Sequence, residues 1–200
     1  MAKGDASLLS LLAHPDMLEN GVRRVAAGAD LAGPDGLRFQ YVLEADPRLI
    51  RLPPPVADAG RTDKLWTHTC FEAFVGFPGS SGYLELNFSP SGQWAAYRFD
   101  SYRQGMAPAL EAAPRLVLRR LTDRLELQAE VRLGVGMLAP AQGPNAPQPR
   151  LRVALSMVVE DLEGRLSYWA LRHPAGRPDF HHAEGFSLAL ELPSQPASPL

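Results

Sequence analysis

The sequence predicts an all-β protein, a sandwich of antiparallel strands, and three observations lead to this fold class. Apolar and polar residues alternate along several stretches, which is typical of half-buried strands. Turn-forming residues separate these stretches at hairpin spacing, as in a sandwich or barrel. The 200 residues include 19 prolines and 17 glycines, and punctuation at this frequency disfavours long helices.

Residues 1–18 are expected to form an N-terminal arm that packs on the domain as a short helix or an extended segment. The apolar run 6–13 has no basic cluster before it and ends at His14 and Pro15. A signal peptide has a basic start, a longer apolar core and a small-residue cleavage site. We therefore expect a cytoplasmic protein, and the single cysteine, Cys70, agrees because it excludes an intrachain disulfide.

The strands are expected along the rest of the chain. The clearest alternation covers 125–133, where every second residue is apolar and the residues between are charged or amidic. Four further stretches repeat this period of two, namely 37–43, 83–88, 151–159 and 186–192. Hairpin turns are expected at 78–82, 90–92, 122–123 and 163–164.

The whole chain, 1–200, is expected to form a single domain, because no repeat or second unit is visible. One turn of helix is expected near 133–138. The stretch 139–149 reads APAQGPNAPQP and is predicted to be a proline-rich surface loop. Residues 193–200 are predicted to be a flexible tail.

Charge and hydropathy exclude several partners. The net charge is −2 and the arginines are scattered, which disfavours binding to nucleic acid or an anionic membrane. No apolar run approaches the ~20 residues that a membrane-spanning helix needs. Charge and hydropathy leave the oligomeric state open.

Residues with distinctive chemistry gather in two blocks, 65–103 and 167–182. Together the blocks supply the candidate ligand-binding residues: Trp66, His68, Glu72, Glu85, Asn87, Trp94, Tyr97, Tyr102, Arg103, His173, Asp179 and His181.

Strand geometry decides which of these residues can converge. Alternation along 71–77 places Glu72 on the face opposite Phe71, and it places Glu85 and Asn87 on one face of the next strand. If the aliphatic faces point inward, these three polar residues meet on an outer face. Carboxylates and amides accept hydrogen bonds from hydroxyl groups, and aromatic planes pack on C–H faces, so a sugar suits such a surface.

Structural roles are the alternative for each residue. Trp66 and Trp94 could be ordinary core aromatics. Glu72 could form a cross-strand ion pair with Arg98 or Arg103, which would contribute little. Cys70, between apolar neighbours, is expected to be a small buried hydrophobe and not a nucleophile.

The histidines suggest a second hypothesis, a metal or heme site. His173, His181 and Asp179 could converge if 174–178 forms a turn, and His68 could join them across strands. A three-ligand site with an open position would suit zinc. No H-E-x-x-H, paired C-x-x-C or C-x-x-C-H motif is present, so no metal ligand or cofactor is assigned.

A hydrolase is a third hypothesis. Glu72 and Glu85 could act as a glycosidase pair. The chain lacks the G-x-S-x-G motif of a serine hydrolase, so no catalytic residue is assigned. A scaffold domain, whose polar block only builds the fold, is the fourth hypothesis.

Three strings, LWTHTCFEAFVGF, YLELNFSPSGQWAAYRFDSYR and RHPAGRPDFHH, resemble the bacterial DOMON-like domain proteins, which are similar to family 9 carbohydrate-binding modules. The resemblance covers 14–192. It implies an immunoglobulin-like or jelly-roll sandwich that binds heme or sugars. Trp66 and Glu72 match a tryptophan and a glutamate of the family 9 pattern, whereas Thr69 and Cys70 stand where the sugar-binding modules carry acidic residues.

Heme-binding relatives use methionine and histidine as axial ligands. Met106 or Met157 with His68 or His173 would be the candidates here. The leading hypothesis from the sequence remains a non-catalytic domain that binds a small, polar, carbohydrate-like ligand. Heme or metal binding, hydrolysis and a scaffold role are its alternatives.

Overall fold

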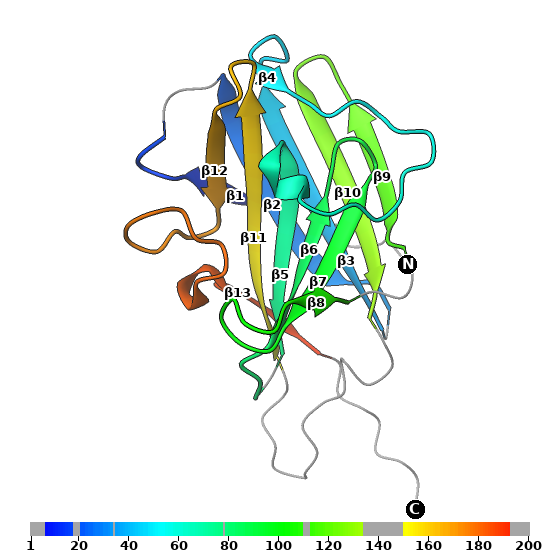
Figure 1. Cartoon of the computed structure of the whole chain (residues 1–200), viewed down its shortest axis with the longest axis vertical. Coiled ribbons are helices and arrows are strands. Elements are labelled where there is room, and N and C mark those ends of the chain that lie inside the picture. Colours follow the sequence, from blue (N-terminus) through cyan, green and yellow to red (C-terminus); the bar gives the residue numbers. More distant parts are fainter. Residues whose placement is uncertain are drawn as a thin grey trace, which may run out of the picture.

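Two antiparallel sheets pack face to face in the computed structural model of the chain (Figure 1). The structure describes residues 7–17, 21–33, 35–77, 79–109, 113–133 and 150–192. Strand β1 (Leu9–Ala13) joins the two sheets, because residues 9–11 pair with β2 in one sheet and residues 12–13 pair with β12 in the other.

We call the sheets A and B. Sheet A contains, in spatial order, β1, β2 (Val22–Leu31), β3 (Gly36–Ala45), β10 (Arg124–Arg132) and β9 (Arg115–Arg120). Sheet B contains β8 (Ala107–Pro108), β7 (Trp94–Phe99), β6 (Tyr83–Phe88), β5 (Cys70–Gly76), β11 (Arg150–Asp161), β12 (Leu166–Ala170) and β1. The short strands β4 (Ile50–Arg51) and β13 (Leu188–Glu191) pair with opposite ends of β11.

The main core lies between the sheets. In sheet A, β3 and β10 alternate between buried and partly exposed residues, so each contributes one apolar face to this core. Phe39 of sheet A packs against Phe88 of sheet B, with ring centroids 6.1 Å apart. The alternating strands therefore bury their apolar faces between two packed sheets.

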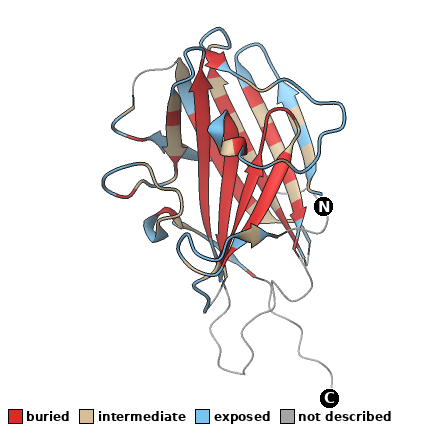
Figure 2. Cartoon of the chain, in the orientation of Figure 1, coloured by how far each residue is buried: buried red, intermediate tan, exposed pale blue. Residues whose placement is uncertain are grey.

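Sheet B differs because both of its faces are buried. Every residue of β5 and β6 is buried, and Figure 2 shows these strands red along their whole length. The face turned away from sheet A, which we call the outer face, carries a second apolar cluster around Phe74 and Tyr83. Three segments, 65–67, 101–106 and 174–186, lie around this face, and we call them the cap. They include two 3-10 helices, η1 (Leu65–Thr67) and η2 (Ala183–Gly185).

The structure confirms the expected all-β sandwich. The described part of the N-terminal arm is extended and forms β1, and the described residues contain no α-helix. Strand β2 was not among the expected strands. The expected helical turn beyond residue 133, the loop at 139–149 and the tail at 193–200 lie outside the described residues. Among the described residues, no helix is long and apolar enough to cross a membrane.

Candidate functional site

The strand register places the polar residues of the outer face in a row. Ser156 on β11 lies opposite Glu72 on β5, and Glu72 lies opposite Asn87 on β6. Two residues further along the strands, Phe74 lies opposite Glu85, so Glu72 and Glu85 are diagonal neighbours on adjacent strands. The expectation that Glu72, Glu85 and Asn87 share one face is therefore met.

A pocket of about 480 Å³ opens above these carboxyl groups. Its volume falls within the ~300–1,000 Å³ of small-molecule sites. The pocket is lined by Trp66, Thr67, Glu72, Glu85, Phe99, Arg103, Met106, Val158, Leu166, Tyr168, Pro178, Phe180 and His181.

The floor of the pocket is acidic and incompletely hydrogen-bonded. Glu72 and Glu85 are 4% and 5% exposed, and Asn87 beside them is fully buried. The Asn87 amide donates to Glu85 Oε1 over 2.7 Å. Glu72 Oε1, Asn87 Oδ1 and Ser156 Oγ are buried without a hydrogen-bond partner. Buried polar atoms are nearly always paired, so a cluster of unpaired ones indicates a place where a ligand or water binds.

Burial changes the protonation of the floor. Desolvation raises the pKa of Glu72 well above its ordinary value, and the charge of Glu85 raises it further. Desolvation also raises the pKa of Glu85, although Asn87 and Arg103 act against it. Burial raises the pKa of the neighbouring Cys70 thiol well above its ordinary value, which fits a structural thiol and not a nucleophile.

His181 forms one side of the pocket as a neutral ring. Desolvation, helped by the charge of Arg103, lowers its pKa to about 4. The Arg103 amide donates to the Tyr83 hydroxyl over 3.1 Å, and that hydroxyl lies 2.8 Å from His181 Nδ1. We therefore assign the hydroxyl proton to the bond with Nδ1 and the ring proton to Nε2, which lies 3.6 Å from Glu85 Oε2.

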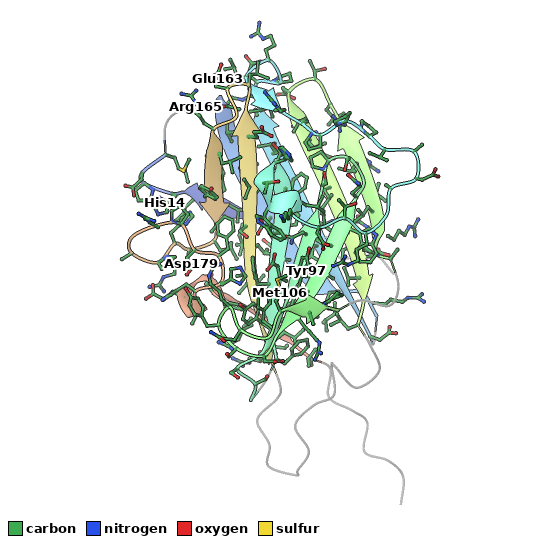
Figure 3. The ribbon with its side chains drawn as sticks, viewed as in Figure 1. His14, Tyr97, Met106, Glu163, Arg165 and Asp179 are labelled. Carbon is green, nitrogen blue, oxygen red and sulfur yellow. The ribbon has the colours of Figure 1, made fainter. Side chains whose placement is uncertain are left out.

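Asp179 holds two segments of the cap together. Its carboxylate accepts hydrogen bonds from the Tyr102 hydroxyl at 2.5 Å, Arg103 Nη2 at 2.7 Å and the His181 amide at 3.1 Å. Burial would raise the pKa of Asp179, but these hydrogen bonds outweigh it and hold the pKa below its ordinary value. Met106 and Asp179 come from loops near the same end of sheet B (Figure 3).

Arg103 adopts a left-handed backbone with φ 53°. This conformation is costly for a residue other than glycine, and it persists where surrounding contacts fix it. Here the hydrogen bonds to Tyr83 and Asp179 fix it. Lys64, immediately before η1, has a similar φ of 61°. The segments that supply Trp66 and Arg103 to the pocket thus both contain a strained residue.

Aromatic rings form the walls. Trp66 in η1 packs edge-on against Tyr97, with centroids 5.8 Å apart, and Tyr168 packs edge-on against Phe180 at 5.9 Å. Tyr97 does not line the pocket; it supports Trp66 from behind and donates its hydroxyl proton to Asp63 over 2.5 Å. Desolvation and this hydrogen bond raise the pKa of Tyr97 to about 12.

The structure does not bring every expected residue to the pocket. Trp94 lies on the inner face of β7 and packs in the main core, because alternation places it opposite to Tyr97. His68 is exposed beside Glu160, with Nδ1 and Oε2 2.7 Å apart. His173 bonds through Nε2 to the carbonyl of Leu12.

Three further residues lie next to the pocket without lining it. Asn87 lies beneath the floor and positions Glu85. Tyr102 and Asp179 line a shallow depression on the other side of Arg103. Both contact Arg103, and Asp179 also accepts a hydrogen bond from the His181 amide.

The histidines do not converge on a metal centre as the second hypothesis required. His68, His173 and His181 have different neighbours, and the described residues contain no group of three or more His, Cys, Asp or Glu side chains arranged for a metal ion. Of the two methionines considered for heme, Met157 lies in the main core, whereas Met106 lines the pocket.

Met106 was considered from the sequence only as a heme ligand, and several other pocket residues were not expected at all: Thr67, Phe99, Val158, Leu166, Tyr168, Pro178 and Phe180. Alternation could have identified Val158 and Tyr168, because they lie on the face of β11 and β12 opposite the core residues. Nothing in the local pattern of the loops indicates that Met106 and Phe180 meet there.

Comparison with known proteins supports the fold. No protein-family model and no curated protein sequence matches the chain. Among solved structures, the chain is similar to a protein from Bacteroides uniformis ATCC 8492 that is described as a candidate carbohydrate-binding protein. That match has a TM-score of 0.66 and 13% identity, and it covers 93% of this chain and 86% of the other.

The chain is also similar to a family 9 carbohydrate-binding module from Caldicellulosiruptor kristjanssonii, solved in complex with cellotriose. The TM-score is 0.52, the identity is 12%, and the match covers 98% of this chain and 87% of the module. At such identities the likeness shows a shared sandwich fold.

Proposed function

We propose that this protein is a non-catalytic module that binds a small, polar, carbohydrate-like ligand in the outer-face pocket of sheet B. The observation that carries the proposal is the combination of a polar floor, at Glu72 and Glu85, with aromatic walls, at Trp66 and Tyr168. Sugars present hydroxyl groups at their edges and C–H groups on their faces, and this pocket offers partners for both.

The incompletely hydrogen-bonded floor and the pocket volume indicate which groups the ligand carries and how large it is. Glu72 lines the pocket, and its buried Oε1 has no partner, so its carboxyl group is incompletely hydrogen-bonded and can accept a hydrogen bond from a ligand hydroxyl. The volume of about 480 Å³ suits a ligand of about one or two sugar rings. A long polysaccharide would have to leave most of its rings outside.

Independent observations agree with this proposal. The two similar structures are a candidate carbohydrate-binding protein and a family 9 module in complex with cellotriose. The resemblance of the sequence to DOMON-like domains and family 9 modules implies the same class of activity. Membership of the DOMON-like group is part of the proposal.

Isothermal titration calorimetry with glucose, cellobiose, cellotriose and a wider panel of mono- and disaccharides tests this function. We expect at least one sugar to bind. Trp66→Ala is expected to weaken that binding by roughly tenfold or more, because stacking and apolar contact area are lost. Glu85→Gln is expected to weaken it as well, since the carboxyl group is a partner for ligand hydroxyls.

Arg98→Ala is the matched control for a surface change on the same sheet. Arg98 is exposed on β7 and lies outside the pocket lining, so its removal should leave the affinity unchanged. Failure of the whole panel to bind, or equal binding by wild type and Trp66→Ala, would contradict the proposal.

Hydrolysis is a second candidate, favoured by one observation. Glu72 and Glu85 are two neighbouring carboxyl groups with raised pKa values in one pocket, and such pairs serve glycosidases. Incubating each bound sugar with the protein and quantifying new reducing ends separates the two functions. A pure binding module releases none, and a hydrolase loses its turnover in both Glu72→Gln and Glu85→Gln.

A further inference from the structure

We propose that the ligand carries a protonated amine beside its hydroxyl groups, as an amino sugar does, and that the ammonium group binds at Glu72 and Glu85. This inference rests on the proposed function, because it concerns the same pocket. It names the class of ligand that the floor is built to hold.

The first argument is the charge of the pocket. Among the described residues that line it, Glu72 and Glu85 are acidic and Arg103 is the permanent cation. Arg103 is paired with Asp179 over 2.7 Å, so its charge is already balanced. The floor therefore contains two buried acids without a cation of their own, and burying unpaired carboxylates is unfavourable.

His181 does not supply the missing cation. Its Nδ1 is bonded to the Tyr83 hydroxyl, and its ring lies against Phe74 and Phe99 at centroid distances of 5.0 and 5.1 Å. Charging this ring would place a cation among apolar neighbours. An ammonium group from outside can approach the carboxyl group of Glu72, because Glu72 lines the pocket. The buried Oε1 of this carboxyl group has no hydrogen-bond partner within the protein.

The walls favour a cation as well. Trp66, Phe99, Tyr168 and Phe180 line the pocket around the acidic floor. Aromatic faces attract ammonium groups, and the attraction grows when water is excluded. A hydroxyl group would also donate a hydrogen bond to the floor, but it has no positive charge to neutralise the two acids or to interact with the aromatic faces.

The titratable and charged groups around Glu72 come from every neighbouring element. They are Glu85 and Tyr83 on β6, Cys70 on β5, Tyr97 on β7, Tyr168 on β12, Tyr41 from sheet A, and Arg103 and His181 from the cap.

Calorimetry with four compounds in mildly acidic buffer tests the proposal: glucosamine, glucose, N-acetylglucosamine and cyclohexylamine. Glucosamine and glucose differ at one ring position, and acetylation removes the charge of the amine. We expect glucosamine to bind at least about tenfold more tightly than glucose and N-acetylglucosamine, as a charge-assisted hydrogen bond predicts.

The four compounds separate the two proposals. Equal affinities for glucosamine and glucose would overturn the ammonium site and leave carbohydrate binding standing. Cyclohexylamine binding as tightly as glucosamine would overturn carbohydrate binding and support the ammonium site. No binding by any of the four would overturn the ammonium site, and carbohydrate binding would be overturned only if the wider sugar panel also failed to bind.

Proton release and Glu72→Gln provide a second readout. An ammonium group favours the ionised form of Glu72, so binding should release a proton, detected as a binding enthalpy that depends on the ionisation enthalpy of the buffer. Glucose should release none. Glu72→Gln should reduce the release, with Glu85 supplying what remains, and should reduce the preference for glucosamine to within about threefold. Glu44→Gln, on the outer face of sheet A, is the matched control that keeps both. Proton release as large as that of wild type in a folded Glu72→Gln variant would contradict the assignment.

Discussion

The outer faces of both sheets carry charged side chains, but these side chains differ in burial and in pairing. On sheet A, Arg38 lies between Asp30 and Glu130, at 3.4 and 3.2 Å, and Arg24 pairs with Glu44 at 3.1 Å. These charges are of opposite sign and partly open to solvent. Such pairs contribute little to stability, and they keep the face soluble.

On sheet B the polar residues are buried, of like charge and incompletely paired. Glu72 and Glu85 lie under the cap, and Glu72 Oε1 has no partner. A protein gains nothing in stability from this arrangement, because desolvation of a carboxyl group is costly. The comparison of the two faces therefore indicates that the buried acids of sheet B lower the stability of the fold at a place suited to binding.

The largest expected effect tests whether the cap is part of the core. Phe74 is fully buried on the outer face of sheet B, 5.0 Å from His181 and 6.3 Å from Phe186 between ring centroids. Phe74→Ala should lower the free energy of unfolding by about 3–5 kcal/mol. Val117→Ala, at a 39% exposed position on sheet A, should change it by less than about 0.5 kcal/mol. Urea denaturation measures both, and equal costs would mean that the cap does not seal the face.

The next effect is the pH dependence of stability, where two groups of the site act in opposite directions. His181 has a pKa of about 4 instead of 6.5, so the unfolded chain binds a proton that the folded chain does not, and stability is lost as pH falls from 6.5 towards 4. Glu72 has a raised pKa, so the folded chain retains a proton, and stability is lost as pH rises above about 4.3.

Urea denaturation across this pH range separates the two contributions. Each group changes the free energy of unfolding by up to about 1.4 kcal/mol per pH unit. Glu72→Gln should reduce the loss of stability at rising pH, to which Glu85 also contributes, and His181→Gln should reduce the loss at falling pH, to which Asp179 also contributes. Val117→Ala adds no titrating group and serves as the control. Profiles of both variants that run parallel to wild type would show that neither group is buried as described.

A smaller effect compares one ion pair on each face. Asp179→Asn removes the charge that holds Tyr102 and Arg103, and should cost about 1–2 kcal/mol. Glu44→Gln removes the charge paired with Arg24 and should cost less than about 1 kcal/mol. The lowered pKa of Asp179 means that its contribution is lost as pH falls below about 4, so wild type and Asp179→Asn should converge there. A constant difference at all pH values would contradict this role.

Most of the fold was predicted from the sequence because half-buried strands show an alternation of apolar and polar residues. The alternation over 125–133 corresponds to β10, and that over 151–159 to β11. Strand β2 was not predicted because its inward residues include the small Ala27 and Ala29, which differ little in hydrophobicity from their neighbours.

The floor of the site was predictable, whereas its cap was not. Glu85 and Asn87 share a face because successive side chains of a strand point to opposite faces, and the apolar neighbours of Glu72 place it on the same face. Trp94 and Tyr97 are an odd number of residues apart on one strand, so only one of them could face the pocket, and only the pairing of sheets shows which. The contact of Arg103 with Asp179 joins loops 76 residues apart, and no local pattern encodes such a contact.

The most direct test of the outer-face pocket follows the three tryptophan indole N–H signals by NMR while a sugar is added. Trp66 lines the pocket, Trp94 lies in the main core, and the Trp169 indole donates to Ser167 on the core side of sheet B. The account predicts that the Trp66 signal shifts with added glucosamine and saturates, while the other two remain in place. A Trp66 signal that stays unchanged while the protein binds the sugar would contradict it.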